Sequence, residues 1–249
     1  MLLLRAIVFN LLSWLIFAVL GPLYLPLLLI PGKRGERVMM AAGTAWSRLM
    51  LRLAAVVVGL DYEVRGRENI PSTPALFAIK HQSAWDTLAV ASLLPSPVVV
   101  LKRELFWIPF YGWYARRAGM IAIDRSAGAS ALRAMLRAAR AAIAKGRPIV
   151  IFPQGTRTLP ASQGGETKPY QPGVAALYGD LDVPVIPVAL NSGLFWSRRA
   201  FRKYPGRIIV QFLPPLAPGL SKRDFLARLE VVTEEATKQL ESKQYQSNS

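Results

Sequence analysis

The segment Ala75-Leu-Phe-Ala-Ile-Lys-His-Gln-Ser-Ala-Trp-Asp86 decides how the chain is organised. Its first half is a short apolar run, which predicts a buried strand that delivers His81 to the loop at the strand's carboxyl end, where open α/β sheets place their sites. His81 and Asp86 are five residues apart, a spacing that corresponds to about 140° on a regular helix. We therefore expect His81 in the loop and Asp86 in the first turn of the helix that follows.

This His–Asp pair has two interpretations. A carboxylate on one ring nitrogen of His81 fixes the tautomer and leaves the other nitrogen free to take a proton from a substrate. Alternatively, His81 is an ordinary loop histidine and Asp86 only complements a helix N-terminus. The spacing H-x4-D alone does not choose between them. Ser83 lies between the two but has no strand-to-helix elbow of its own, so we do not expect it to be a nucleophile.

Outward from this segment, short apolar runs alternate with helical patterns, which is typical of α/β folds. We expect an α/β domain with a mixed, mostly parallel sheet flanked by helices, preceded by an N-terminal two-helix membrane-anchoring element. One predicted helix covers Ala129–Lys145, and the last begins at Ser221 and ends near Lys243. The predicted strands are Tyr62–Val64, Ala75–Ile79, Val98–Leu101, Met120–Ile123, Pro148–Phe152, Val185–Leu190 and Ile208–Phe212.

The amino-terminal part is strongly apolar. Residues 6–30 are long enough to span a bilayer, but Gly21, Pro22 and Pro26 interrupt them, so the segment is either a kinked span or a re-entrant element. The apolar run is longer than a signal-peptide core, which disfavours a cleaved leader. The basic segment 32–37 predicts a turn that faces the cytoplasm, and an interfacial helix over about 38–60 follows. We expect two domains, residues 1–60 at the membrane and 61–249 as the catalytic part.

Composition limits the classes of function. The 249 residues include 31 Lys and Arg against 15 Asp and Glu, giving a formal net charge of +16 that favours anionic partners. The mean hydropathy of +0.28 indicates a membrane contact. Because the chain has no cysteine and one histidine, disulfides, thiol catalysis and His-rich metal centres are excluded. No nucleic-acid-binding motif is visible, so lipid is the favoured anionic partner.

Two predicted strands end close to an arginine. Asp124-Arg125 follows the strand that ends at Ile123, and Pro153-Gln-Gly-Thr-Arg157 follows the strand that ends at Phe152. Arginine presents a fork of donors that suits phosphate, and Gly155 allows close approach of backbone amides to a ligand. This pair of arginines therefore predicts an anion site beside His81. Three further arginines on the helix 129–145 form one stripe and are interpreted as solvated surface charges.

Four blocks together carry a resemblance to the glycerolipid acyltransferase family: residues 81–86, 119–125, 152–157 and 183–188. The resemblance spans about residues 60–215. It implies that His81 is the general base, that Asp86 orients it, and that the acceptor phosphate is held by Arg125, Gln154, Gly155, Thr156 and Arg157. The third block departs from the family pattern F-P-E-G-T-R, because Gln154 stands where glutamate is expected. That departure puts the identity of the acceptor in question more than the reaction.

The resemblance implies an acyltransferase that moves a fatty acyl group from acyl-CoA or acyl-carrier protein to the sn-2 hydroxyl of 1-acylglycerol-3-phosphate, giving phosphatidic acid. We expect no cofactor and no metal, membrane lipids as partners, and the cytoplasmic face of a bacterial inner membrane as the location. One alternative is acylation of lyso-ornithine lipid or a lysophospholipid. Another is a non-enzymatic adaptor that binds anionic lipid.

Overall fold

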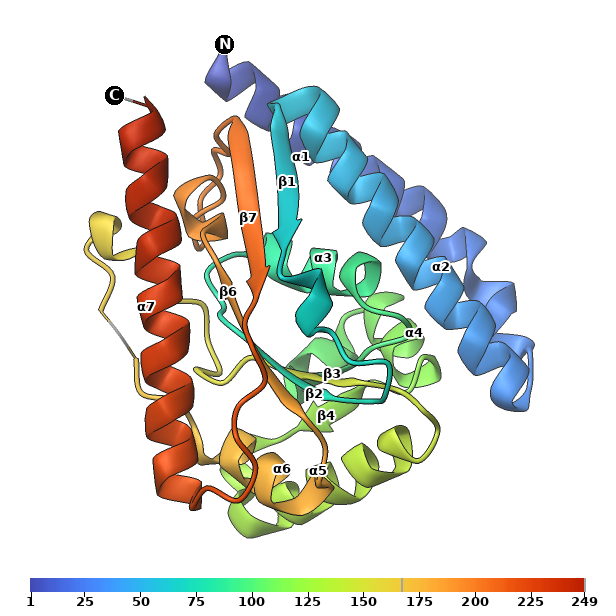
Figure 1. Cartoon of the computed structure of the whole chain (residues 1–249). Coiled ribbons are helices and arrows are strands. Elements are labelled where there is room, and N and C mark those ends of the chain that lie inside the picture. The colour runs from blue at the N-terminus through green and yellow to red at the C-terminus, as the bar shows by residue number, and fades with distance from the viewer. Residues whose placement is uncertain (167, 249) are drawn as a thin grey trace.

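A seven-stranded sheet forms the centre of the molecule (Figure 1). The computed structural model describes residues 1–166 and 168–248, except for the side chains of residues 125 and 243–248. The strand order is β1-β7-β6-β2-β5-β3-β4, and every neighbouring pair is parallel except β6 with β7. The strands are β1 (Leu60–Arg65), β2 (Leu76–Ile79), β3 (Val98–Lys102), β4 (Ile121–Ile123), β5 (Ile149–Ile151), β6 (Val185–Leu190) and β7 (Gly206–Phe212).

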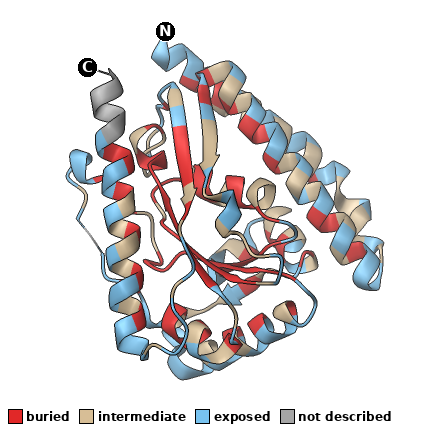
Figure 2. Ribbon diagram, in the orientation of Figure 1, coloured by how far each residue is buried: buried red, intermediate tan, exposed pale blue. Residues whose placement is uncertain are grey.

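Helices cover both faces of the sheet. The helices are α1 (Leu2–Leu23), α2 (Gly32–Leu53), α3 (Ala84–Leu93), α4 (Tyr111–Arg117), α5 (Gly128–Ile143), α6 (Pro172–Leu181) and α7 (Lys222–Asn248). In β2, Phe77 and Ile79 belong to the core with α1, α2, α3 and α4, whereas Leu76 and Ala78 belong to the core with α5, α6 and α7. This alternation follows from the two-residue period of a strand. Figure 2 shows the buried residues concentrated in the strands between these layers.

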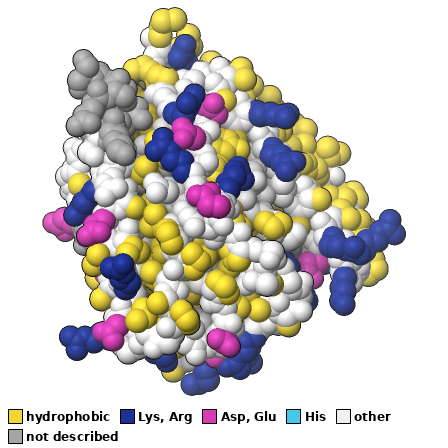
Figure 3. All heavy atoms as spheres, viewed as in Figure 1, with side chains coloured by type: hydrophobic (Ala, Val, Ile, Leu, Met, Phe, Trp, Pro, Cys, Tyr) yellow, Lys and Arg dark blue, Asp and Glu magenta, His cyan; other side chains and the backbone are white. Residues whose placement is uncertain are grey.

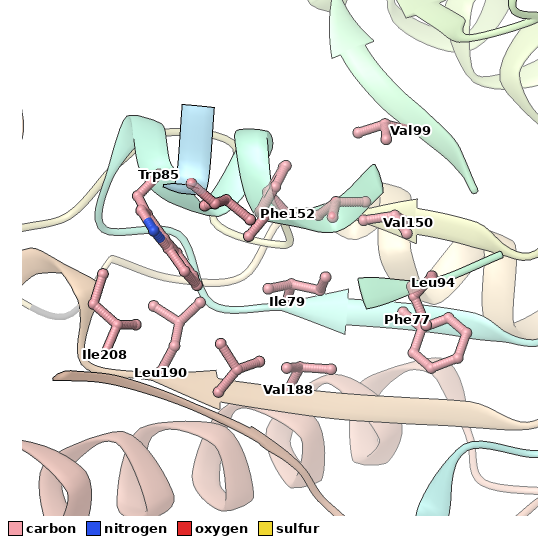
Figure 4. Close-up of a cluster of buried hydrophobic side chains, with 14 of the residues drawn as sticks. Phe77, Ile79, Trp85, Leu94, Val99, Val150, Phe152, Val188, Leu190 and Ile208 are labelled. Carbon is pink, nitrogen blue, oxygen red and sulfur yellow. The ribbon is translucent and has the colours of Figure 1, made fainter. Parts of the chain in front are cut away.

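The first of these cores lies directly beneath the segment that carries His81. Figure 4 shows Trp85 pointing from α3 toward Leu190 and Ile208 in the strands below, with Ile79 and Phe152 nearby. Trp85 is 1% exposed and lies one residue before Asp86. Burying a side chain of this size stabilises the fold by roughly 2–3 kcal/mol. The start of α3 is therefore anchored in the core, which holds Asp86 in place.

Helices α1 and α2 pack side by side along one edge of the molecule (Figure 1). α2 also contacts α3 through polar side chains: Thr44 donates to the Ala91 carbonyl at 3.1 Å, and Ser47 lies 2.7 Å from Ser92, hydroxyl to hydroxyl. Near the start of α2, Glu36 pairs with Arg147 and, at 3.1 Å, with Lys145. Helix α2 is thus fixed to the body by specific polar contacts.

All seven predicted strands are present, with ends within two residues of those expected. The prediction of a basic turn at residues 32–37 was wrong, because these residues form the first turns of α2. Pro31 is extended and precedes the helix, and the ion pairs of Glu36 hold its first turns against the body. At the end of α1, Gly21 and Pro22 remain helical; a short 3-10 helix, Leu25–Leu29, contains Pro26 in its first turn.

Candidate active site

The loop between β2 and α3 places His81 and Asp86 as the five-residue spacing predicted. Ser83 caps α3 by accepting a hydrogen bond from the Trp85 amide at 3.1 Å. Asp86, in the first turn, accepts the amides of Gln82 and Ser83 through Oδ2, each at 2.8 Å. The same oxygen lies 2.9 Å from Nδ1 of His81. The capping of the helix therefore aims the carboxylate at the imidazole.

A fourth hydrogen bond fixes the other oxygen of Asp86. Ser192 donates from its hydroxyl to Asp86 Oδ1 at 2.5 Å, and the Asp86 side chain is fully enclosed. Ser192 comes two residues after β6, which is the sheet neighbour of β2. Sequence reasoning missed this residue. Its position just after a predicted buried strand, at the same sheet edge as His81, is the signal that points to it.

The imidazole of His81 is held on several sides. The ring stacks on Phe152 with centroids 4.1 Å apart, and the backbone carbonyl of His81 accepts a hydrogen bond from the Thr158 amide at 2.9 Å. Nδ1 is occupied by Asp86, and within the described part of the chain no hydrogen-bond partner occupies Nε2. An imidazole oriented in this way by a carboxylate is suited to general-base catalysis through Nε2.

A cavity of about 490 Å³ is lined by His81 and by residues of α1, α2, α3 and α4. This volume lies within the range of about 300–1,000 Å³ typical of small-molecule sites. Burial raises the pKa of the phenols of Tyr111 and Tyr114, which line it and stay uncharged at neutral pH. Most of its lining is apolar and includes Phe17, Leu20, Met39, Met40, Gly43, Trp46, Leu88, Val99, Leu101, Leu105, Ile108 and Met120. The cavity is therefore shaped for a hydrocarbon chain.

Arg157 is the predicted binding residue that reaches the cavity. It lines the cavity together with His81 and is half-buried, and no carboxylate pairs with it among the described residues. Gly155 has a φ of 67° and donates its amide to the Phe152 carbonyl at 2.9 Å, which forms the tight turn before Arg157. Arg157 and His81 therefore line one and the same cavity.

The other predicted binding residues lie elsewhere. Gln154 is buried and directs its amide nitrogen to Glu234 Oε1 on α7, at 3.4 Å, rather than to an arginine. Neither Gln154, Gly155 nor Thr156 lines the cavity. The side chain of Arg125 lies outside the part of the chain that the structure describes; its backbone begins the 3-10 turn Arg125–Ala127, and the Ser126 amide donates to Asp124 at 3.0 Å.

The site combines a carboxylate-oriented imidazole, an arginine and a long apolar cavity on an α/β sheet. This combination is that of an enzyme site in which a general base faces an apolar ligand. Within the described residues, no cluster of three His, Cys, Asp or Glu side chains has a geometry that could hold a metal ion.

Comparison with known proteins agrees with this class. The profile of the family described as Acyltransferase matches residues 61–191, so the chain belongs to that family. It is 40% identical over 171 residues to a 1-acyl-sn-glycerol-3-phosphate acyltransferase of Pseudomonas aeruginosa, covering 69% of this chain and 65% of that protein. It is 31% identical over 225 residues to the mouse 1-acyl-sn-glycerol-3-phosphate acyltransferase alpha, covering 88% of this chain and 75% of that protein.

A solved structure shares the fold. The crystal structure of the 1-acyl-sn-glycerophosphate acyltransferase of Thermotoga maritima superposes with a TM-score of 0.74 at 20% identity, covering 96% of this chain and 99% of that one. The match therefore includes the two amino-terminal helices as well as the sheet. The predicted fold class, a mostly parallel sheet preceded by two apolar helices, is confirmed.

Proposed function

We propose that this acyltransferase moves an acyl group from a thioester to the sn-2 hydroxyl of 1-acylglycerol-3-phosphate, giving phosphatidic acid. His81 Nε2 takes the hydroxyl proton as the oxygen attacks the thioester carbonyl, and Asp86 stabilises the imidazolium that forms. The tetrahedral intermediate then collapses, the carbon–sulfur bond breaks, and the imidazolium returns the proton to the leaving thiolate. The observation that carries this proposal is the 2.9 Å contact between Asp86 and His81, a histidine that lines the apolar cavity.

Arg157 supports a phosphate on the acceptor. Arg157 lines the same cavity as His81, and a guanidinium binds phosphate through paired, charge-assisted hydrogen bonds. A lysophosphatidate held there by its phosphate places its free hydroxyl near the imidazole. This arrangement favours lysophosphatidate over a lysophospholipid whose phosphate carries a further head group.

The cavity supports a fatty acyl donor. Its apolar walls favour a chain by about 0.8 kcal/mol for each buried methylene, which is roughly fourfold in affinity, until the cavity is filled. The donor is acyl-CoA or acyl-carrier protein, both of which present the acyl group as a thioester and carry negative charge that matches the basic chain. The reaction needs no cofactor.

The membrane supplies the acceptor and receives the product. Two described helices, Leu2–Leu23 and Gly32–Val58, are long and apolar enough to cross a membrane, which indicates membrane association. Figure 3 shows hydrophobic side chains along this edge, with Lys and Arg gathered where α1 and α2 are joined. Lys33, Arg34 and Arg37 are exposed there, where they suit acidic head groups. We place the enzyme on the cytoplasmic face of a bacterial inner membrane.

The test is transfer by the purified protein in phospholipid vesicles. Acyl-CoA and acyl-carrier protein are each offered with lysophosphatidate, lysophosphatidylcholine and lyso-ornithine lipid, and the products are separated by chromatography. We expect transfer to lysophosphatidate and a loss of about 10⁴-fold or more in the His81→Ala variant. Arg157→Ala should raise the KM for lysophosphatidate at least about tenfold. Folded protein that transfers acyl groups to none of these acceptors would refute the proposal.

A further inference from the structure

Helix α7 holds both residues that flank His81. Glu234 accepts Lys80 Nζ through both carboxylate oxygens, at 2.7 and 2.8 Å. Glu241 accepts the side-chain amide of Gln82 at 2.7 Å. The two glutamates are seven residues apart, which is about two helical turns and places them on the same face. One helix therefore binds the side chains of the residues immediately before and immediately after His81.

These contacts are enclosed. The Lys80 and Glu234 side chains are 4% and 13% exposed, and Glu241 is 6% exposed. A buried ion pair contributes little to stability, because the loss of hydration offsets the attraction of the charges. It does, however, fix direction and distance closely, since both charges lack water as an alternative partner. The pairing of Lys80 with Glu234 is thus better suited to positioning than to stabilising the fold.

Glu234 also reaches the loop that carries Arg157. Its Oε1 accepts Tyr170 Oη at 3.0 Å and the Gln154 amide at 3.4 Å, in addition to Lys80. Gln154 is three residues before Arg157 and follows β5, the sheet neighbour of β2. A single carboxylate on α7 therefore joins the His81 loop to the Arg157 loop.

The neutral side chain at position 154 has its explanation in this contact. A glutamate there would place a second carboxylate about 3.4 Å from Glu234 Oε1, next to one lysine. Lys80 and Gln154 both donate hydrogen bonds to the same oxygen of Glu234, so their side chains approach each other. If position 234 were neutral, a carboxylate at position 154 could take its place as the partner of Lys80. The carboxylate that the family pattern places at position 154 is, in this chain, contributed by α7.

We propose that Glu234 and Glu241 are positioning residues for catalysis, and that Gln154 is neutral because Glu234 supplies the carboxylate that joins Lys80 to the Arg157 loop. The proposal rests on acyl transfer through His81. It assigns to the last helix, outside the residues matched by the family profile, a part in setting the geometry of the reaction.

An exchange of charge tests the proposal. Glu234→Gln and Gln154→Glu are each expected to lower kcat about 10²-fold, as displacements of about 1 Å do, while the KM for the donor stays within about threefold. The double variant Gln154→Glu/Glu234→Gln restores one carboxylate beside Lys80 and should recover to within about tenfold of wild type. The matched control is Glu235→Gln, an exposed neighbour on α7 that should leave kcat unchanged.

Glu241 provides a second arm if the variants at position 234 do not fold. Glu241→Gln keeps an acceptor for Gln82 and should retain activity, whereas Glu241→Ala should lower kcat about tenfold in folded protein. The proposal would be overturned if the double variant Gln154→Glu/Glu234→Gln lost kcat by the product of the two single-variant losses. Equal kcat in Glu241→Ala and wild type would also overturn it. A wild-type protein that transfers nothing would instead refute the proposed function.

Discussion

Replacing Asp86 by asparagine separates the charge of this residue from its orienting hydrogen bonds. Oδ2 of Asp86 accepts three donors, His81 Nδ1 and the amides of Gln82 and Ser83, whereas Oδ1 accepts, among the described residues, the Ser192 hydroxyl alone. The substituted asparagine therefore turns its NH₂ toward Ser192, because a hydroxyl can rotate to accept and an amide N–H cannot. The side-chain oxygen of the variant then keeps all three remaining hydrogen bonds, including the one that fixes the His81 tautomer.

What the variant loses is the attraction between a carboxylate and the developing imidazolium. Two unit charges about 4 Å apart attract by about 4 kcal/mol at an effective dielectric constant of about 20. We therefore expect Asp86→Asn to lower kcat by about 10²–10³-fold. Asp86→Ala, which removes orientation as well as charge, should lose about 10⁴-fold or more.

The assay is steady-state acyl transfer to lysophosphatidate in vesicles, with circular dichroism to verify folding. Asp61→Asn is a matched control, because Asp61 is an exposed aspartate whose side chain accepts the next backbone amide, at 2.7 Å. Equal losses in Asp86→Asn and Asp86→Ala would refute the argument that Ser192 rotates to preserve the orientation of His81. An Asp86→Asn variant with more than about a tenth of wild-type activity would refute the need for the charge.

Four other perturbations have defined outcomes. Ser192→Ala should lower kcat about tenfold by removing a hydrogen bond to Asp86 Oδ1, measured in the same assay; an unchanged kcat would contradict this. Gly43→Leu should shift donor preference toward shorter acyl chains in a donor panel, because Gly43 lines the cavity, a Cβ there meets no atom within 4 Å, and a leucine would narrow the cavity. Trp107→Ala with Trp113→Ala should weaken vesicle flotation at least about tenfold, since these residues are 71% and 44% exposed in and just before α4, which packs against α2. Burial raises the pKa of Glu241 above the ordinary glutamate value of 4.5, so ionisation of Glu241 destabilises the folded protein as the pH rises above 4.5. The Tm of Glu241→Gln relative to wild type should therefore increase with pH from 4.5 upward, and a pH-independent difference in Tm would contradict this.

Local patterns were sufficient to predict the strands and the position of the His–Asp pair. The strand before His81 is continuously apolar, and the five-residue spacing excludes a shared helical face, so both conclusions depend on neighbouring residues alone. The structure bears out this geometry, with Asp86 in the first turn of α3 and His81 in the loop. The catalytic and binding roles of these residues stay predictions.

The remaining parts of the site come from distant segments. Ser192 is 106 residues from Asp86 in the chain, and Glu234 is 154 residues from Lys80. No local pattern encodes these contacts, because they depend on β6 and α7 packing beside β2. Gln154 shows the same limit: the sequence identified the missing glutamate, but only the fold shows that a carboxylate from α7 faces that position.

The composition of the cavity wall limits how the sequences of α1 and α2 can change. Phe17 and Leu20 of α1, with Met39, Met40 and Trp46 of α2, form part of the cavity wall. Under the proposed function, the same two helices contact the lipid phase and limit the space available to the acyl chain. Deleting them to obtain a water-soluble enzyme would remove one side of the cavity. Substitutions in α1 and α2 that suit a different membrane would then also alter the wall of the cavity, and with it the fatty acid that fits.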